Sequence, residues 1–183
     1  MRCMAIVTIG VLSAFVPARA GAQAQPHQAE RRATAPAIPE SLLAEHTAIH
    51  AELVEATKAG GRVGEAAREL AALLDPHFKR ENEIALPPLG LLTPLAAGER
   101  PAGMKEALAM TDALRKELPR MLEEHKQIHA ATEKLQRVAR EEKDSRFEKF
   151  AEELAAHARS EEEVLYPAAI LVGDVIRARL ASK

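Results

Sequence analysis

From Ser41 onward, apolar residues recur every three or four positions, and no segment alternates with a period of two. This spacing keeps one face of a helix apolar, so it predicts helices rather than strands. Four such segments follow one another, at residues 41–58, 63–84, 114–139 and 145–164. Helices of this length joined mostly by short loops predict an all-α fold, an up-down-up-down antiparallel four-helix bundle.

Three prolines and two additional helical segments change the simple prediction of four uninterrupted helices. Pro76 and Pro119 fall inside the second and third helical segments, where each should kink or split its helix because proline lacks a backbone N–H donor. Pro167 should end or bend the fourth helix. Short extra helices are expected at residues 104–116 and 168–180.

The sequence repeats itself after about 80 residues. Residues 45–51 (EHTAIHA) match residues 124–130 (EHKQIHA), and residues 77–81 (HFKRE) match residues 157–161 (HARSE). Each half is therefore predicted to be one helical hairpin, with H-x3-H on its first helix and H-x3-E on its second.

The N-terminal residues have the layout of a secretory signal peptide. Arg2 gives a short positive start, residues 3–16 are almost entirely apolar, and small residues in A-x-A spacing follow Pro17. The apolar run is shorter than the roughly 20 residues that a membrane-spanning helix needs, so no membrane span is expected after cleavage. The predicted organisation is a signal peptide at 1–22, a disordered leader at 23–40 and the bundle domain at 41–183. We therefore expect an exported protein, either periplasmic or secreted.

Composition excludes several classes of function. Aromatic residues make up only 3% of the chain and tryptophan is absent, which argues against surfaces that stack nucleic-acid bases. The formal net charge of −2 gives no basic field for polyphosphate, so no nucleic-acid partner is expected. Cys3 is the single cysteine, which excludes an internal disulfide or a cysteine-rich metal site.

Six of the seven histidines, together with two glutamates, are predicted to converge inside the bundle. Residues four apart on a helix lie on one face, with Cβ atoms about 5–6 Å apart. Four of the histidines and both glutamates occupy the apolar stripes, whereas His50 and His129 lie one position round from them. The candidate metal ligands are His46, His50, His77, Glu81, His125, His129, His157 and Glu161.

The energetics of burial favour a metal site. A carboxylate inside a bundle without a partner takes up a proton or destabilises the fold by several kcal/mol. Glu81 and Glu161 become favourable there only with cations or with complete hydrogen-bond networks. Histidine and carboxylate without thiolate suit iron or manganese, with zinc possible, and carboxylates that bridge two ions would satisfy both glutamates.

These motifs resemble those of the hemerythrin-like proteins, the family of HHE cation-binding domains. The resemblance covers about residues 41–167 and rests on E-H-x-x-I-H in the first and third helices and on H-x3-E in the second and fourth. The Leu-Pro and Tyr-Pro pairs at 86–87 and 166–167 add to it. It implies a four-helix bundle around a non-haem di-iron centre with a bridging oxo or hydroxo group. It also implies chemistry with dioxygen, nitric oxide or peroxide.

The resemblance also implies how the ligands divide between two irons. The implied ligands are His46 and His77 for one iron and His125, His129 and His157 for the other. Glu81 and Glu161 would bridge the two ions. His50 stands where oxygen-carrying members usually hold an apolar residue. It would either saturate its iron and make reversible oxygen binding doubtful, or only support the site.

Residues next to these motifs have simpler interpretations. Glu45 and Glu124 could orient imidazoles, but a solvated helix face is the favoured expectation. Glu162 is expected to be a surface charge. Tyr166 is expected to cap the end of the bundle, with an approach to the site as the alternative, and Phe78 is expected in the core.

Three functions remain open from the sequence. The first is an exported di-iron protein that binds or senses dioxygen or a related small molecule without turnover. The second is an enzyme that reduces or detoxifies nitric oxide or peroxide at the same centre. The third is a metal-storage protein.

Overall fold

The computed structural model describes residues 35–182, which are helical and contain no strand. The elements are α2 (Glu40–Lys58), α3 (Gly61–Ile84), the 3₁₀ turn η1 (Pro87–Leu91), α4 (Leu92–Ala96), α5 (Met104–Glu141), α6 (Ser145–Ser160), the π-helical turn η2 (Glu161–Leu165) and α7 (Tyr166–Ala181). The predicted signal peptide at 1–22 and most of the predicted leader at 23–40 lie outside the described residues.

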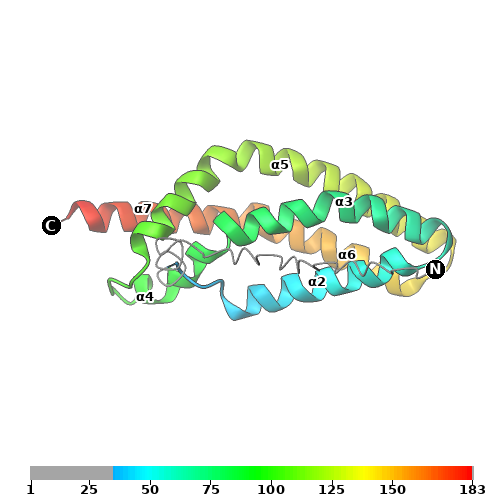
Figure 1. Cartoon of the computed structure of the whole chain (residues 1–183), viewed down its shortest axis with the longest axis horizontal. Coiled ribbons are helices and arrows are strands. Elements are labelled where there is room, and N and C mark those ends of the chain that lie inside the picture. The colour runs from blue at the N-terminus through cyan, green and yellow to red at the C-terminus, as the bar shows by residue number, and fades with distance from the viewer. Residues whose placement is uncertain (1–34, 183) are drawn as a thin grey trace, which may run out of the picture.

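Helices α2, α3, α5 and α6 form an antiparallel bundle (Figure 1). Helix α3 packs between α2 and α5, and α6 packs against α5 and α2, so successive helices around the bundle run in opposite directions. Helix α7 continues from α6 and packs against the first part of α5. The predicted all-α, up-down-up-down fold with short extra helices is confirmed.

Two apolar clusters fill the bundle at different levels. One contains Leu74 of α3 and Ile128 of α5, and the other contains Ile84 of α3 and Met121 of α5. Along both helices the segment between these clusters carries the polar motif residues, such as His125. The apolar packing therefore holds the four helices above and below a polar layer.

Neither internal proline splits its helix. Helix α3 runs through Pro76 and α5 runs through Pro119, so the predicted extra helix at 104–116 is the first part of α5. A proline removes only one backbone donor, and the burial of each helix against its neighbours outweighs that loss. Figure 1 shows α5 bent along its length, which is the milder of the two expected outcomes.

The helical path also continues through Pro167, which lies in the first turn of α7, where a missing N–H costs nothing. The join between α6 and α7 is the π-helical turn η2, in which the Tyr166 N–H donates to the Glu161 carbonyl. A π turn is wider than an α turn and brings residues five apart onto one side. Glu161 and Tyr166 are accordingly both 1% exposed.

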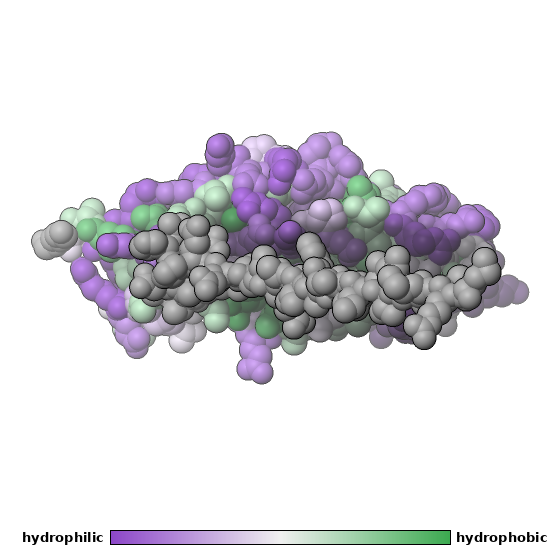
Figure 2. Space-filling view, viewed as in Figure 1, coloured by the Kyte–Doolittle hydropathy of each residue, from purple (hydrophilic) through white to green (hydrophobic). Residues whose placement is uncertain are grey.

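Hydrophilic residues cover most of the coloured surface in Figure 2, with smaller apolar areas between them. Some of these side chains link neighbouring helices, as in the ion pair between Arg146 of α6 and Glu52 of α2. Among residues 35–182, no helix combines the length and the apolarity needed to cross a membrane.

The packing of the first apolar cluster predicts a large effect of Leu135→Ala. Leu135 is 0% exposed, so we expect its truncation to lower the free energy of unfolding by about 3 kcal/mol, because it leaves a cavity in the core. Leu43→Ala is the matched control, since Leu43 is 48% exposed, and its effect should stay within about 0.5 kcal/mol. Denaturant unfolding followed by circular dichroism measures both, and equal losses would contradict the assigned core.

Candidate metal centre

The structure brings together six of the eight predicted site residues in the polar layer of the bundle. All six are at most 4% exposed, and they come from five different elements. They are His46 of α2, His77 and Glu81 of α3, His125 of α5, His157 of α6 and Glu161 of η2.

The four buried histidines form two pairs. The Nε2 atoms of His77 and His125 are 2.8 Å apart, and the rings of His46 and His157 meet edge to face with centroids 5.0 Å apart. This grouping differs from the implied division, in which His46 and His77 share an ion. Helix α3 packs against both α2 and α5, so adjacency alone does not choose the partner of His77; its imidazole faces His125 of α5.

Glu161 lies between the two histidine pairs. Its Oε1 is 3.2 Å from His46 Nε2 and 2.8 Å from His157 Nε2. Its Oε2 points the other way and is 3.5 Å from His125 Nε2. One carboxylate therefore presents a different oxygen to each pair.

Glu81 lies between the same two pairs. Its Oε1 is 3.4 Å from His77 Nε2, and its Oε2 is 3.9 Å from His46 Nε2. Within residues 35–182 the Oε2 atom is buried and has no hydrogen-bond partner. A buried carboxylate oxygen without a donor is costly unless a cation lies near it.

A second set of carboxylates holds three of the imidazoles from outside. His77 Nδ1 donates to Glu124 at 2.9 Å, and His125 Nδ1 donates to Glu162 at 2.8 Å. His157 donates in the same way to Glu45 at 3.0 Å. The favoured expectation that these outer glutamates are only solvated surface charges is therefore wrong.

These outer hydrogen bonds determine what each imidazole presents to the interior. An ionised carboxylate only accepts, so it fixes the proton on Nδ1 and leaves a lone pair on Nε2. The Nε2 atoms of His77 and His125 then face one another at 2.8 Å as two acceptors. Two acceptors can lie this close only if a proton or a metal ion lies between them. The negative charges of the surrounding carboxylates are suited to a metal ion.

The charges in the site are strongly coupled. Burial and the neighbouring Glu161 charge raise the pKa of Glu81. Burial alone would raise the pKa of Glu161 as well, but the contacts with His157 and His46 lower it to about 2. Burial opposes protonation of His157, yet Glu161 and Glu45 raise its pKa to about 9. The two inner carboxylates thus require positive charge beside them.

Tyr166 is the site residue that sequence reasoning placed wrongly. Its hydroxyl donates to Glu81 and lies 3.1 Å from His125 Nε2 and 3.3 Å from His77 Nε2, rather than capping the bundle end. Burial and the nearby carboxylates raise the pKa of this phenol. The signal that could have found it is the repeat, which aligns Tyr166-Pro167 with Leu86-Pro87 just after each H-x3-E motif.

The prediction that His50 and His129 converge on the bundle interior is wrong. Their side chains are 55% and 50% exposed and pair with Asp75 at 3.7 Å and Glu133 at 3.6 Å. One step along a helix turns a side chain by about 100°, which is enough to carry it from the buried stripe to solvent.

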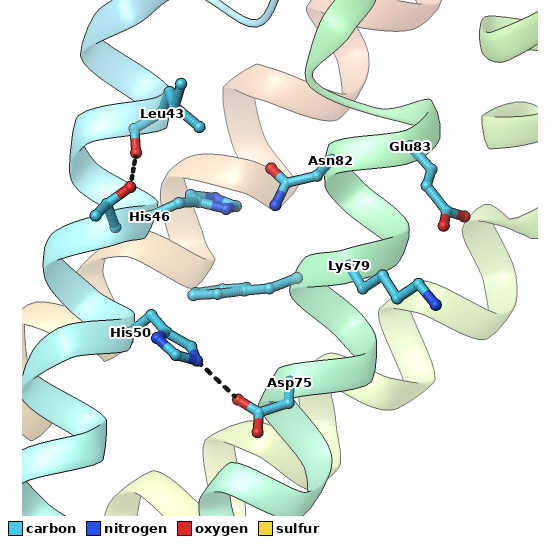
Figure 3. Close-up of a pocket in the computed structure, with 9 residues that line it drawn as sticks. Leu43, His46, His50, Asp75, Lys79, Asn82 and Glu83 are labelled. Atoms are coloured by element: carbon cyan, nitrogen blue, oxygen red, sulfur yellow. Dashed lines mark hydrogen bonds and ion pairs between the residues drawn. The ribbon is translucent and has the colours of Figure 1, made fainter. Parts of the chain in front are cut away.

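A surface pocket of about 480 Å³ borders the centre between α2 and α3. His46 lines it, stacked on Phe78 with ring centroids 4.3 Å apart. Figure 3 shows the side chains of His46 and Asn82 pointing toward one another, with the His50–Asp75 pair farther along the pocket. In the described part of the chain, His46 Nδ1 has no hydrogen-bond partner.

The fold and the site together define a helical-bundle protein with a buried histidine and carboxylate centre suited to metal. Residues 37–169 match the family model of the hemerythrin HHE cation-binding domain. The chain therefore belongs to the hemerythrin HHE cation-binding domain family. No curated protein and no solved structure matches it significantly.

The outer carboxylates predict a graded effect on metal affinity. Glu124→Ala should weaken metal binding about 10- to 100-fold, because His77 loses the acceptor that fixes its ring and proton. The neighbouring Glu123 pairs only with Lys126 in the described structure, so Glu123→Ala is the control and should leave the affinity unchanged. Anaerobic competition for ferrous iron with a chelator measures both, and equal affinities would contradict a supporting role for Glu124.

Proposed function

We propose that this chain is an exported non-haem di-iron protein that binds or senses dioxygen, or a related small molecule such as nitric oxide, in the bundle core. The observation that carries the proposal is the position of Glu81 and Glu161. Both are buried, and each directs one oxygen to the His77 side and the other to the His46 side. Carboxylates placed in this way suit two neighbouring ions.

The donor atoms support two ions rather than one. His77, Glu81, His125 and Glu161 form one group whose ligand atoms lie mutually close, and His46, His157 and Glu161 form another. The groups share Glu161, and Glu81 Oε2 is directed toward His46. A single ion would leave the second oxygen of each carboxylate without a positive partner inside a nonpolar bundle.

The donor chemistry supports iron. Imidazole and carboxylate without thiolate suit iron or manganese, and zinc is compatible with the same donors. When bound, an iron pair would supply redox chemistry toward dioxygen, nitric oxide or peroxide. The chain itself would hold the imidazoles in position through Glu45, Glu124 and Glu162 and keep bulk water out, since the inner residues are nearly inaccessible.

The surroundings of the site support a small ligand. The pocket between α2 and α3 ends at His46, whose side chain is only 4% exposed. A large substrate could not reach the buried donors past this ring and Phe78. The small opening therefore favours a small molecule, such as a diatomic gas, as the ligand.

Export is the part of the proposal that rests on sequence alone. The short positive start, the apolar run at 3–16 and the small residues that follow Pro17 support a cleaved signal peptide. We propose that the bundle works in the periplasm or outside the cell.

Metal analysis of the purified full chain tests the di-iron centre. After anaerobic reconstitution we expect about two irons per chain and ultraviolet charge-transfer bands once the iron is oxidised. His77→Ala should lose bound iron, because it removes an inner donor, whereas His129→Ala should retain it as the exposed control. A colourless protein with less than one iron per chain would rule out the centre.

Stoichiometry separates binding from catalysis. The reduced di-iron protein should take up dioxygen or nitric oxide once per centre and release it, or stay in the changed state, without repeated consumption. Stopped-flow absorbance and a gas electrode measure this reaction. Many turnovers in the presence of a supplied reductant would contradict a binding or sensing role and favour an enzyme that removes nitric oxide or peroxide.

A further inference from the structure

The position of the Tyr166 hydroxyl points to a further metal ligand that makes the two halves of the centre unequal. We propose that the Tyr166 oxygen is a direct ligand at the metal position defined by His77 and His125. This inference rests on the proposed function, because it concerns how that centre holds its ions. It goes beyond the histidine and glutamate motifs from which the centre was deduced.

The distances among the donor atoms carry the argument. The Tyr166 oxygen is 3.1 Å from His125 Nε2 and 3.3 Å from His77 Nε2, and these two nitrogens are 2.8 Å apart. His77 Nε2 is 3.4 Å from Glu81 Oε1, and His125 Nε2 is 3.5 Å from Glu161 Oε2. Neighbouring ligands of an octahedral ion with bonds of about 2.1 Å lie about 3.0 Å apart. The distances from the phenol oxygen to the two Nε2 atoms are therefore close to those expected between neighbouring ligands of one metal ion.

The side of the imidazole that Tyr166 contacts argues against a role limited to orienting the two rings. Glu124 and Glu162 support His77 and His125 from outside, at Nδ1. Tyr166 instead approaches both rings at Nε2, the nitrogen that faces the inner carboxylates. A side chain that only oriented the imidazoles would lie at the opposite edge of each ring.

The backbone delivers Tyr166 to this position through the turn η2. The Tyr166 N–H donates to the Glu161 carbonyl, a bond that spans five residues and places both side chains on the inner face. Tyr166 is 1% exposed, so its hydroxyl has been taken out of water into the layer of donor atoms. π turns inserted in α-helices occur often at functional sites.

The internal repeat shows that this ligand belongs to one half only. An offset of 80 residues relates His157, Glu161 and Tyr166 to His77, Glu81 and Leu86. Leucine has no atom that can bind a metal, so the half defined by His46 and His157 lacks the equivalent donor. Within residues 35–182, one position therefore has five donors and the other has four, which directs an external ligand to the His46 side.

The same pseudo-symmetry distinguishes the outer contacts. Glu162, which accepts from His125, is related by the repeat to Asn82, which faces His46 across the surface pocket (Figure 3). Glu162 is an anion and Asn82 is neutral, and no described residue accepts a hydrogen bond from His46 Nδ1. The half without the tyrosine is thus also the half with the less firmly held histidine.

The chain offers an unambiguous spectroscopic test, because Tyr166 is its only tyrosine. Binding of ferric iron at the phenol oxygen releases the phenol proton to solvent, so the full chain loaded with ferric iron should show a visible charge-transfer band of an iron phenolate. Laser excitation in that band should enhance the ring vibrations of a bound phenolate in the Raman spectrum. A phenol that only donates a hydrogen bond to Glu81 produces neither signal.

Two variants identify the origin of the signal. Tyr166→Phe should keep its helix content and its iron but lose the visible band and the phenolate vibrations. His129→Ala is the matched control, because His129 is exposed, pairs with Glu133 and lies outside the centre, so the change leaves the phenol and its neighbours in place. It should retain both signals, with at most a shift of the band.

The outcomes separate this inference from the proposed function. Two irons per chain without phenolate signals in the wild type would overturn the assignment of Tyr166 and leave the di-iron centre intact. Failure to take up iron would overturn the proposed function and this inference with it. If Tyr166→Phe does not fold, the Raman spectrum of the wild-type protein decides by itself, because no other residue of the chain can be the source.

Discussion

Two carboxylates buried within a bundle of apolar helices are the constraint on which the rest of this structure depends. Glu81 and Glu161 cannot remain there as isolated charges, so each lies among imidazoles, and three of the four imidazoles are in turn held by glutamates nearer the surface. From the centre of the bundle outward, an inner carboxylate is followed by a histidine and then by an outer carboxylate. Apolar clusters on both sides of this layer hold the helices together. The stability of the fold therefore comes from these clusters, and the polar centre is built between them.

Duplication explains the skeleton of the centre but not its asymmetry. The repeated hairpins supply four histidines and two glutamates in equivalent places, and in the bundle His77 faces His125 while His46 faces His157. The halves differ where one repeat has Tyr166 and Glu162 and the other has Leu86 and Asn82. These four residues surround the histidines and glutamates that both halves share, and they do not alter the path of the helices. The halves can therefore differ in donor number and charge while the bundle stays the same.

Periodicity was sufficient to predict the fold and the six inner residues, because a buried stripe on a helix is a one-dimensional pattern. It was too coarse for His50, where a rotation of about 100° decides between interior and solvent. The choice between a kink and a split at Pro119 stayed open, because a local backbone rule does not include the packing energy of a long helix. The role of Glu45 arises from a contact between helices that are far apart in the sequence, and the position of Tyr166 arises from a π turn. The spacing of apolar residues reveals neither.

The two halves differ in their donor sets and in how firmly their imidazoles are held. Tyr166 fills the inner side of the His77 and His125 half and is itself almost inaccessible. The other half borders the pocket through His46, whose ring is held on one side by Phe78 and has no hydrogen-bond partner at Nδ1 among residues 35–182. A small molecule that entered from that pocket would meet the half with fewer donors first, whereas one that entered beside Tyr166 or His77, which also line surface pockets, would meet the other half. The unequal donor sets support the proposed binding of an external ligand, because a symmetric storage site would have no need of them.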